Sequence, residues 1–126
     1  MKKIALILFS LAILTSCSND DDATPEITPV TVTLKATVSG TFNNSSVIQY
    51  RDASGTVKSE ALTLGIWEKS LNVTTGYNLF LKTTGTINGN VEITASATGD
   101  GVSFNDRKAS NTNVDVDFDL EISETL

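Results

Sequence analysis

The sequence predicts an all-β domain, and three observations lead to this prediction. Apolar residues alternate with polar ones in several short runs, and turn residues recur about every 8 to 12 residues. No segment repeats its apolar residues with the period of about 3.6 residues that is typical of a helix. Threonine and valine, which favour strands, are frequent throughout.

The first strand is expected over residues 30–38. Its apolar residues share one face: Val30, Val32, Leu34, Ala36 and Val38. Gly40 and the Asn43-Asn44 pair end it, and a second strand follows over residues 47–51. Residues 52–55 form a turn by composition, which returns the chain as a hairpin into residues 56–64.

The middle of the chain continues this pattern. Gly65 indicates a bend or bulge before a strand over residues 66–73. After a turn over residues 74–76, residues 77–82 are expected to form a strand that is covered on both faces. The Asn88-Gly89 pair is a strong hairpin signal, and it precedes an alternating strand over residues 91–97.

The last part of the chain predicts a turn over residues 98–101, a short strand over 102–104 and a polar loop over 105–113. The final strand covers residues 114–122, where apolar residues alternate with acids. The total is seven to eight short strands. The architecture that buries one face of each is an antiparallel β-sandwich of the immunoglobulin-like kind, with an open barrel as the alternative.

The composition limits the chemistry that the chain can perform. The formal net charge is −6, the sequence has no histidine and it has a single cysteine. No Ser-His-Asp or Cys-His arrangement and no His/Cys zinc site can be built from these residues. An acidic surface also repels phosphate backbones. We therefore expect no enzyme, no cofactor and no nucleic-acid partner.

The N-terminal segment has the parts of an export signal. Lys2 and Lys3 precede an apolar run over residues 4–14, and small residues follow. The residues Leu14, Thr15 and Ser16 before Cys17 resemble the lipobox of bacterial lipoproteins. This resemblance implies that residues 1–16 are a signal peptide and that the Cys17 thiol carries a lipid anchor that can be labelled with palmitate.

Two alternatives to lipidation are an uncleaved membrane anchor and an ordinary secretory signal that leaves a free cysteine. The apolar run is shorter than the roughly 20 residues that a spanning helix needs. No second cysteine is present to pair with Cys17.

Residues 17–29 are expected to form a disordered acidic tether, because they combine acids, two prolines and few apolar side chains. The position of Asp20, Asp21 and Asp22 resembles the acidic export signal that directs Bacteroidota lipoproteins to the outer face of the outer membrane. The alternative is a generic acidic linker. The β domain then covers residues 30–126, which is enough for one domain.

An ordered set of motifs suggests a relationship. These are Val38-Ser39-Gly40-Thr41, then Val47-Ile48-Gln49-Tyr50, then Gly55, then Leu64-Gly65-Ile66-Trp67. Their order is similar to that of the small MmpS-type transport accessory proteins, in which a Leu-Pro-Trp segment stands where this chain has Leu64-Gly65-Ile66-Trp67. The resemblance covers residues 36–97. It implies an immunoglobulin-like β-sandwich, a partner role beside an envelope transporter and no catalytic residues.

Two features of the domain are candidate binding sites. Asp115, Asp117 and Asp119 share one face of the last strand, and carboxylates are ligands that Ca²⁺ prefers. The alternative is a solvated face that protects an edge strand, because these side chains stand about 7 Å apart. Trp67 is a candidate platform for a sugar ring. Its alternative role is a core anchor whose N–H donates to a backbone carbonyl.

The sequence thus predicts a membrane-anchored, surface-exposed lipoprotein with a non-enzymatic binding or structural domain, whose partner is an envelope protein or an extracellular ligand. One alternative is an accessory protein of an envelope transporter that faces the periplasm. Another alternative is a carbohydrate-binding or adhesive module.

Overall fold

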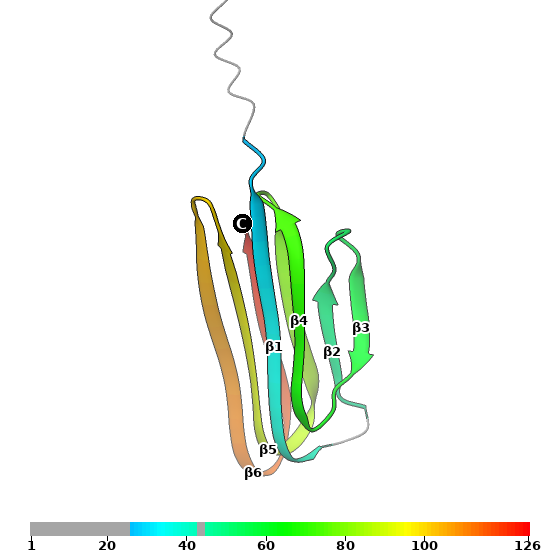
Figure 1. Ribbon diagram of the computed structural model, residues 1–126. Helices are drawn as coiled ribbons and strands as arrows, with labels where there is room; N and C mark the ends of the chain where they lie inside the picture. The colour runs from blue at the N-terminus through cyan, green and yellow to red at the C-terminus, as the bar shows by residue number, and fades with distance from the viewer. Residues whose placement is uncertain (1–25, 43–44) are drawn as a thin grey trace, which may run out of the picture.

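The computed structural model describes residues 26–42 and 45–126 (Figure 1). Within these residues the chain is all β, as predicted, and contains no helix that could span a membrane. The strands are β1 (Pro29–Phe42), β2 (Val47–Arg51), β3 (Val57–Ala61), β4 (Gly65–Thr74), β5 (Asn78–Gly99) and β6 (Val102–Thr125).

All six strands belong to one antiparallel sheet. Along one path the order is β3-β2-β5-β1-β4, and β6 pairs with the other edge of β5. β5 is long enough for two strands to share its first edge, since β2 pairs with residues 81–84 and β1 with residues 87–99. The sheet therefore has two arms, β2–β3 and β1–β4, that are joined through β5.

The sheet is curled, so that its two arms face each other (Figure 1). β5 and β6 bend together at the end of the molecule opposite to residue 26 (Figure 1), and their register shifts between Ile87 and Gly89. The contact between Tyr50 of β2 and Trp67 of β4 demonstrates the closure, because these strands are not neighbours in the sheet.

The core fills the space between the two arms. The predicted alternation in the first strand is confirmed, since Val32, Leu34 and Ala36 are fully buried and the residues between them are not. The central strand β5 contributes the most buried side chains. They are Leu79, Leu81, Thr83, Ile87, Val91, Ile93, Ala95 and Ala97.

The predicted hairpin at Asn88-Gly89 is wrong, because both residues lie inside β5. Gly89 is needed there for close backbone packing. A Cβ on Gly89 would stand 2.1 Å from the Ser39 carbonyl oxygen, and one on Gly40 would stand 2.3 Å from the Asn88 carbonyl oxygen. The two glycines thus let β1 and β5 approach each other where the sheet bends.

The predicted loop over residues 105–113 is also wrong, because these residues lie in β6. Their polarity has a different cause: β6 is an edge strand, and both of its faces meet solvent over this stretch. β5 and β6 each take in two of the predicted segments, so the structure has six strands instead of seven to eight. The prediction that the strand over residues 77–82 is covered on both faces is wrong. Leu79 and Leu81 on one face are buried, but Asn78 on the other face is exposed.

The predicted turn after the second strand is confirmed. The Asp52 carboxylate accepts hydrogen bonds from the backbone N–H groups of Ser54 (2.9 Å) and Thr56 (3.0 Å). Gly55 adopts a φ of 87°, which favours glycine. The turn connects β2 to β3 as a hairpin, as the composition indicates.

Candidate functional site

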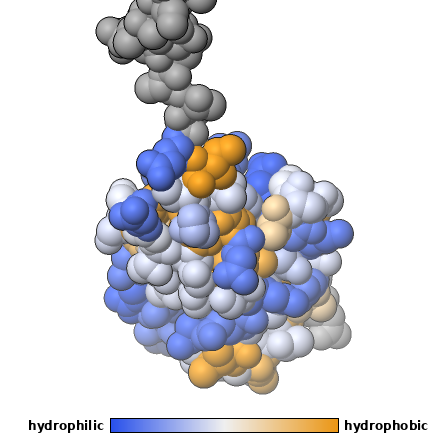
Figure 2. Space-filling view, turned by 45° about the horizontal axis from the view of Figure 1, so that its top comes forward, coloured by the Kyte–Doolittle hydropathy of each residue, from blue (hydrophilic) through white to orange (hydrophobic). Residues whose placement is uncertain are grey.

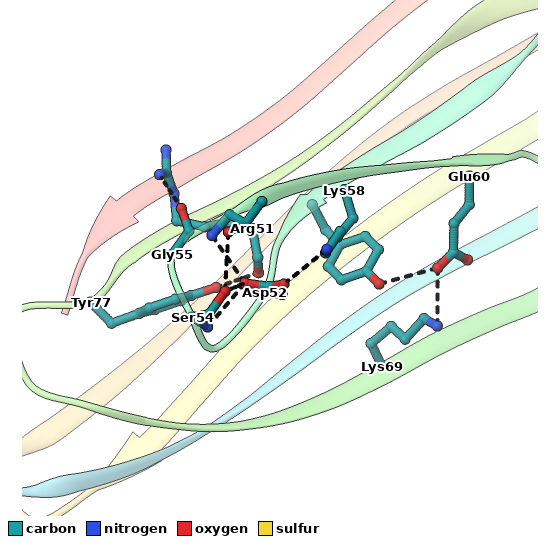
Figure 3. A network of polar contacts seen from close by, with 10 residues as sticks. Arg51, Asp52, Ser54, Gly55, Lys58, Glu60, Lys69 and Tyr77 are labelled. Carbon is teal, nitrogen blue, oxygen red and sulfur yellow. Dashed lines mark hydrogen bonds and ion pairs between the residues drawn. The ribbon is translucent and has the colours of Figure 1, made fainter.

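A cluster of two aromatic rings, a carboxylate and an ammonium group closes the open side of the curled sheet. We call Tyr50, Glu60, Trp67 and Lys69 the Glu60 cluster. Glu60 lies on β3 and accepts hydrogen bonds from the Tyr50 hydroxyl (3.1 Å) and the Trp67 Nε1 (2.8 Å). It also pairs with Lys69 of β4 at 3.1 Å. Figure 3 shows Glu60 and Lys69 reaching toward each other from different strands.

Strand alternation explains why these residues meet. Trp67 and Lys69 are two residues apart on β4 and point to the same face, which is the inner face because Trp67 pairs in register with the buried Ala36. The rings of Tyr50 and Trp67 are 5.3 Å apart, and the Lys69 Nζ lies 5.6 and 5.8 Å from their centroids. These distances are typical of cation–π contacts.

The electrostatics of the Glu60 cluster favour its charged form. The hydrogen bond from Trp67 lowers the pKa of Glu60 below its ordinary value, although burial opposes this shift. The hydrogen bond to Glu60 raises the pKa of Lys69. Glu60 is therefore ionised at neutral pH, whereas a general acid at that pH needs a raised pKa. The arrangement can bind a cation, and the cation that it holds is Lys69.

The structure gives Trp67 a different partner from the one predicted. Its N–H donates to the Glu60 carboxylate, not to a backbone carbonyl, because Trp67 lies on an edge strand where the facing group comes from the other arm. The ring is partly buried against the core and contacts Tyr50. Tyr50 and Lys69 thus occupy part of the surface that a sugar platform would need. Sequence reasoning missed Glu60, because only the curl of the sheet brings it to Trp67.

Asp117, Asp119 and Glu121 lie on the outer face of β6 and interact with β5. Asp117 accepts a hydrogen bond from Thr86 (2.7 Å), and Lys82 pairs with both Asp119 (3.1 Å) and Glu121 (3.2 Å). Asp115 lines a separate surface hollow of about 310 Å³. No group of three potential metal ligands occurs in residues 26–42 and 45–126. The structure thus does not bring Asp115, Asp117 and Asp119 together around one point.

A set of hydrogen bonds holds the start of the described chain to one end of the domain. The Thr75 backbone N–H donates to the Thr28 carbonyl (3.0 Å), and the Thr75 hydroxyl donates to the Glu26 carbonyl (3.3 Å). Beside it, Arg51 and Tyr77 line a hollow of about 500 Å³, and the Tyr77 hydroxyl donates to the Arg51 carbonyl. Figure 3 shows these two residues next to the turn over residues 52–55.

The predicted lipobox residues, Cys17 and the predicted export signal at Asp20, Asp21 and Asp22 lie outside the described residues. The chain enters the described domain at Glu26, and β1 leads away from that end (Figure 1).

Four exposed apolar side chains belong to the end of the domain opposite to Glu26. They are Leu64 (56% exposed), Ile66 (68%), Val114 (58%) and Val116 (41%). On the face seen in Figure 2, hydrophobic residues form small separate groups among hydrophilic and intermediate ones. The exposed apolar side chains at the far end are candidates for contact with a partner.

Comparison with known proteins gives no match among family models, curated proteins or solved structures.

Proposed function

We propose that this chain is a bacterial lipoprotein of the outer membrane, anchored through Cys17 and displayed at the cell surface. Its β domain binds another envelope component or an external ligand, or coats the cell, and catalyses no reaction. The observation that carries this proposal is the sequence that surrounds Cys17: two lysines, an apolar run and a lipobox-like Leu14-Thr15-Ser16. Asp20, Asp21 and Asp22 carry the proposal of surface display.

The geometry of the domain supports a tethered display role. The chain enters at the end where Thr75 bonds to Glu26 and Thr28, and the exposed Leu64 and Ile66 belong to the opposite end. An anchor that precedes Glu26 therefore leaves the far end free to face away from the membrane. A partner from outside the membrane meets that end first.

We also assign the fold to the immunoglobulin-like β-sandwiches, with the open barrel as the alternative. Two facing arms around one core support this assignment. A second candidate function, a transport accessory role on the periplasmic side, is favoured by one observation. Tyr50 and Trp67, which belong to separate motifs of the MmpS-type resemblance, contact each other.

Two measurements test the proposal in the native host. Labelled palmitate is expected to be incorporated into the full chain and not into Cys17→Ala, and incorporation into that variant would refute lipidation. Proteinase K added to intact cells is expected to remove the domain. Protection until the cells are lysed would refute surface display and favour the transport accessory role. An Asp20→Ala, Asp21→Ala, Asp22→Ala variant should stay lipidated but become protected.

A further inference from the structure

The outer edge of β6 is open along its length. Among the described residues, β6 (Val102–Thr125) pairs with β5 alone, and its first half forms one rim of the molecule in Figure 1. The backbone N–H and C=O groups on such an edge are available to a further strand. An extended segment of a partner can add to an edge of this kind through main-chain hydrogen bonds, with its side chains giving specificity.

The first half of β6 carries inward-facing charged side chains that oppose the addition of a further strand. Asp106 and Lys108 pair in register with the buried Ala95 and Ile93, so they share the inner face of the sheet. The two charged groups lie 3.5 Å apart. Inward-pointing charges on an edge strand oppose pairing with another chain. The edge strands β3 and β4 have the same protection, since Glu60 and Lys69 face each other between the arms.

The second half of β6 lacks this protection over residues 116–122. The inner face of this stretch is apolar: Val116, Phe118, Leu120 and Ile122. Val116 is 41% exposed and Leu120 is partly exposed, so both retain surface that a neighbouring strand would cover. Backbone pairing groups and uncovered apolar side chains thus occur together on one open edge.

The outer face of the same stretch is acidic. Asp117, Asp119 and Glu121 alternate with the apolar residues, and the side chains of Asp119 and Glu121 are 63% and 43% exposed. Lys82 pairs with Asp119 and Glu121, and Asp117 accepts a hydrogen bond from Thr86. Opposite charges on directly opposed residues stabilise a strand pair, and like charges destabilise it. An added strand with basic residues on its outer face therefore matches this edge.

We propose that residues 116–122 of β6 accept an added β-strand from a partner protein, an extended segment in which apolar residues alternate with lysine or arginine. A second copy of this chain is a poor occupant, because antiparallel pairing of two β6 strands would set acids against acids. This inference specifies the binding role proposed above, but it does not depend on lipidation or surface display. Binding and membrane location are therefore tested separately.

The test uses the full-length chain in detergent and two fluorescent peptides, one that alternates valine with lysine and one that alternates valine with glutamate. The lysine peptide is expected to bind and to slow amide hydrogen exchange over residues 116–122. The glutamate peptide is expected not to bind. Equal binding of both peptides, no binding of either, or protection confined to another strand would overturn the proposal.

Three variants locate the binding edge. Val116→Lys places a charge on the inner face at a position that is already exposed, and the double variant Asp117→Lys, Asp119→Lys reverses the outer charges. Each is expected to weaken binding of the lysine peptide by about tenfold. Asp100→Lys, an exposed acid outside the strands, is the matched control and should bind as the unaltered chain does. An equal loss in Asp100→Lys would show non-specific attraction and refute the proposed edge. Circular dichroism confirms that each variant is folded.

Discussion

The Glu60 cluster should contribute measurably to stability, and Glu60→Ala tests this. The substitution removes the acceptor of the Tyr50 and Trp67 hydrogen bonds and the partner of Lys69. Hydrogen bonds contribute about 0.5–1.5 kcal/mol each, and a partly exposed ion pair about 0.2–1 kcal/mol. The Glu60 side chain is 37% exposed, so solvent screens these interactions. Taking the lower end of each range gives about 1.2 kcal/mol, or a fall in Tm of about 5–10 °C for a domain of this size.

The assay is thermal unfolding followed by fluorescence, because the chain has one tryptophan and Trp67 belongs to the cluster. The folded Glu60→Ala variant should also show red-shifted emission, since its indole loses a partner and gains contact with water. Glu68→Ala is the control, because Glu68 is the neighbouring acid on the exposed face of β4. Its Tm should change by less than half as much. Equal Tm values for the two variants would refute the stabilising role of the cluster.

Three further outcomes follow from the structure. The pKa of Glu60 is held below its ordinary value of 4.5, so the stability that ionised Glu60 contributes is complete above pH 4.5 and is lost as the pH falls through the folded-state pKa. Thermal unfolding at pH 7 and pH 3 should therefore show a smaller fall in Tm at acid pH for Glu60→Gln than for the unaltered chain. Gly40→Ala should lower the free energy of unfolding in urea by more than about 2 kcal/mol, because its Cβ would meet the Asn88 carbonyl at 2.3 Å. Gly101→Ala is the control: its Cβ meets no atom within 4 Å, so it should lower the free energy of unfolding by about 1 kcal/mol. Equal losses in the two variants would contradict the close packing at Gly40. Millimolar Ca²⁺ should leave the Tm unchanged, and a rise that is absent in Asp117→Asn would restore the calcium hypothesis.

Local patterns predict local structure well in this chain. The alternation over residues 30–38 gives the buried face of β1, and the turn at Asp52 and Gly55 follows from side-chain hydrogen bonding and a positive φ. Both depend on residues that are close in sequence. These two parts of the fold can therefore be read directly from the sequence.

The bend of the sheet could not be read in this way. Asn88-Gly89 has the composition of a hairpin turn, but Gly89 is needed where β5 passes close to Ser39 and Gly40, which are about fifty residues earlier. The polar residues 105–113 look like a loop, because an edge strand that is solvated on both faces has the same composition. The Glu60 cluster depends on the same bend, so its members could not be connected from sequence alone.

The attachment of the chain at β1 determines how the domain responds to force. β1 pairs with β4 on one side from Pro29 onward and with β5 on the other side from Val30 onward. A pull on the residues before Pro29 acts along β1, perpendicular to its hydrogen bonds. Many hydrogen bonds must then break at the same time, instead of one after another. An edge strand pulled at its end would peel. β1 is thus the strand best placed to keep the domain folded when force reaches it through the residues before Pro29.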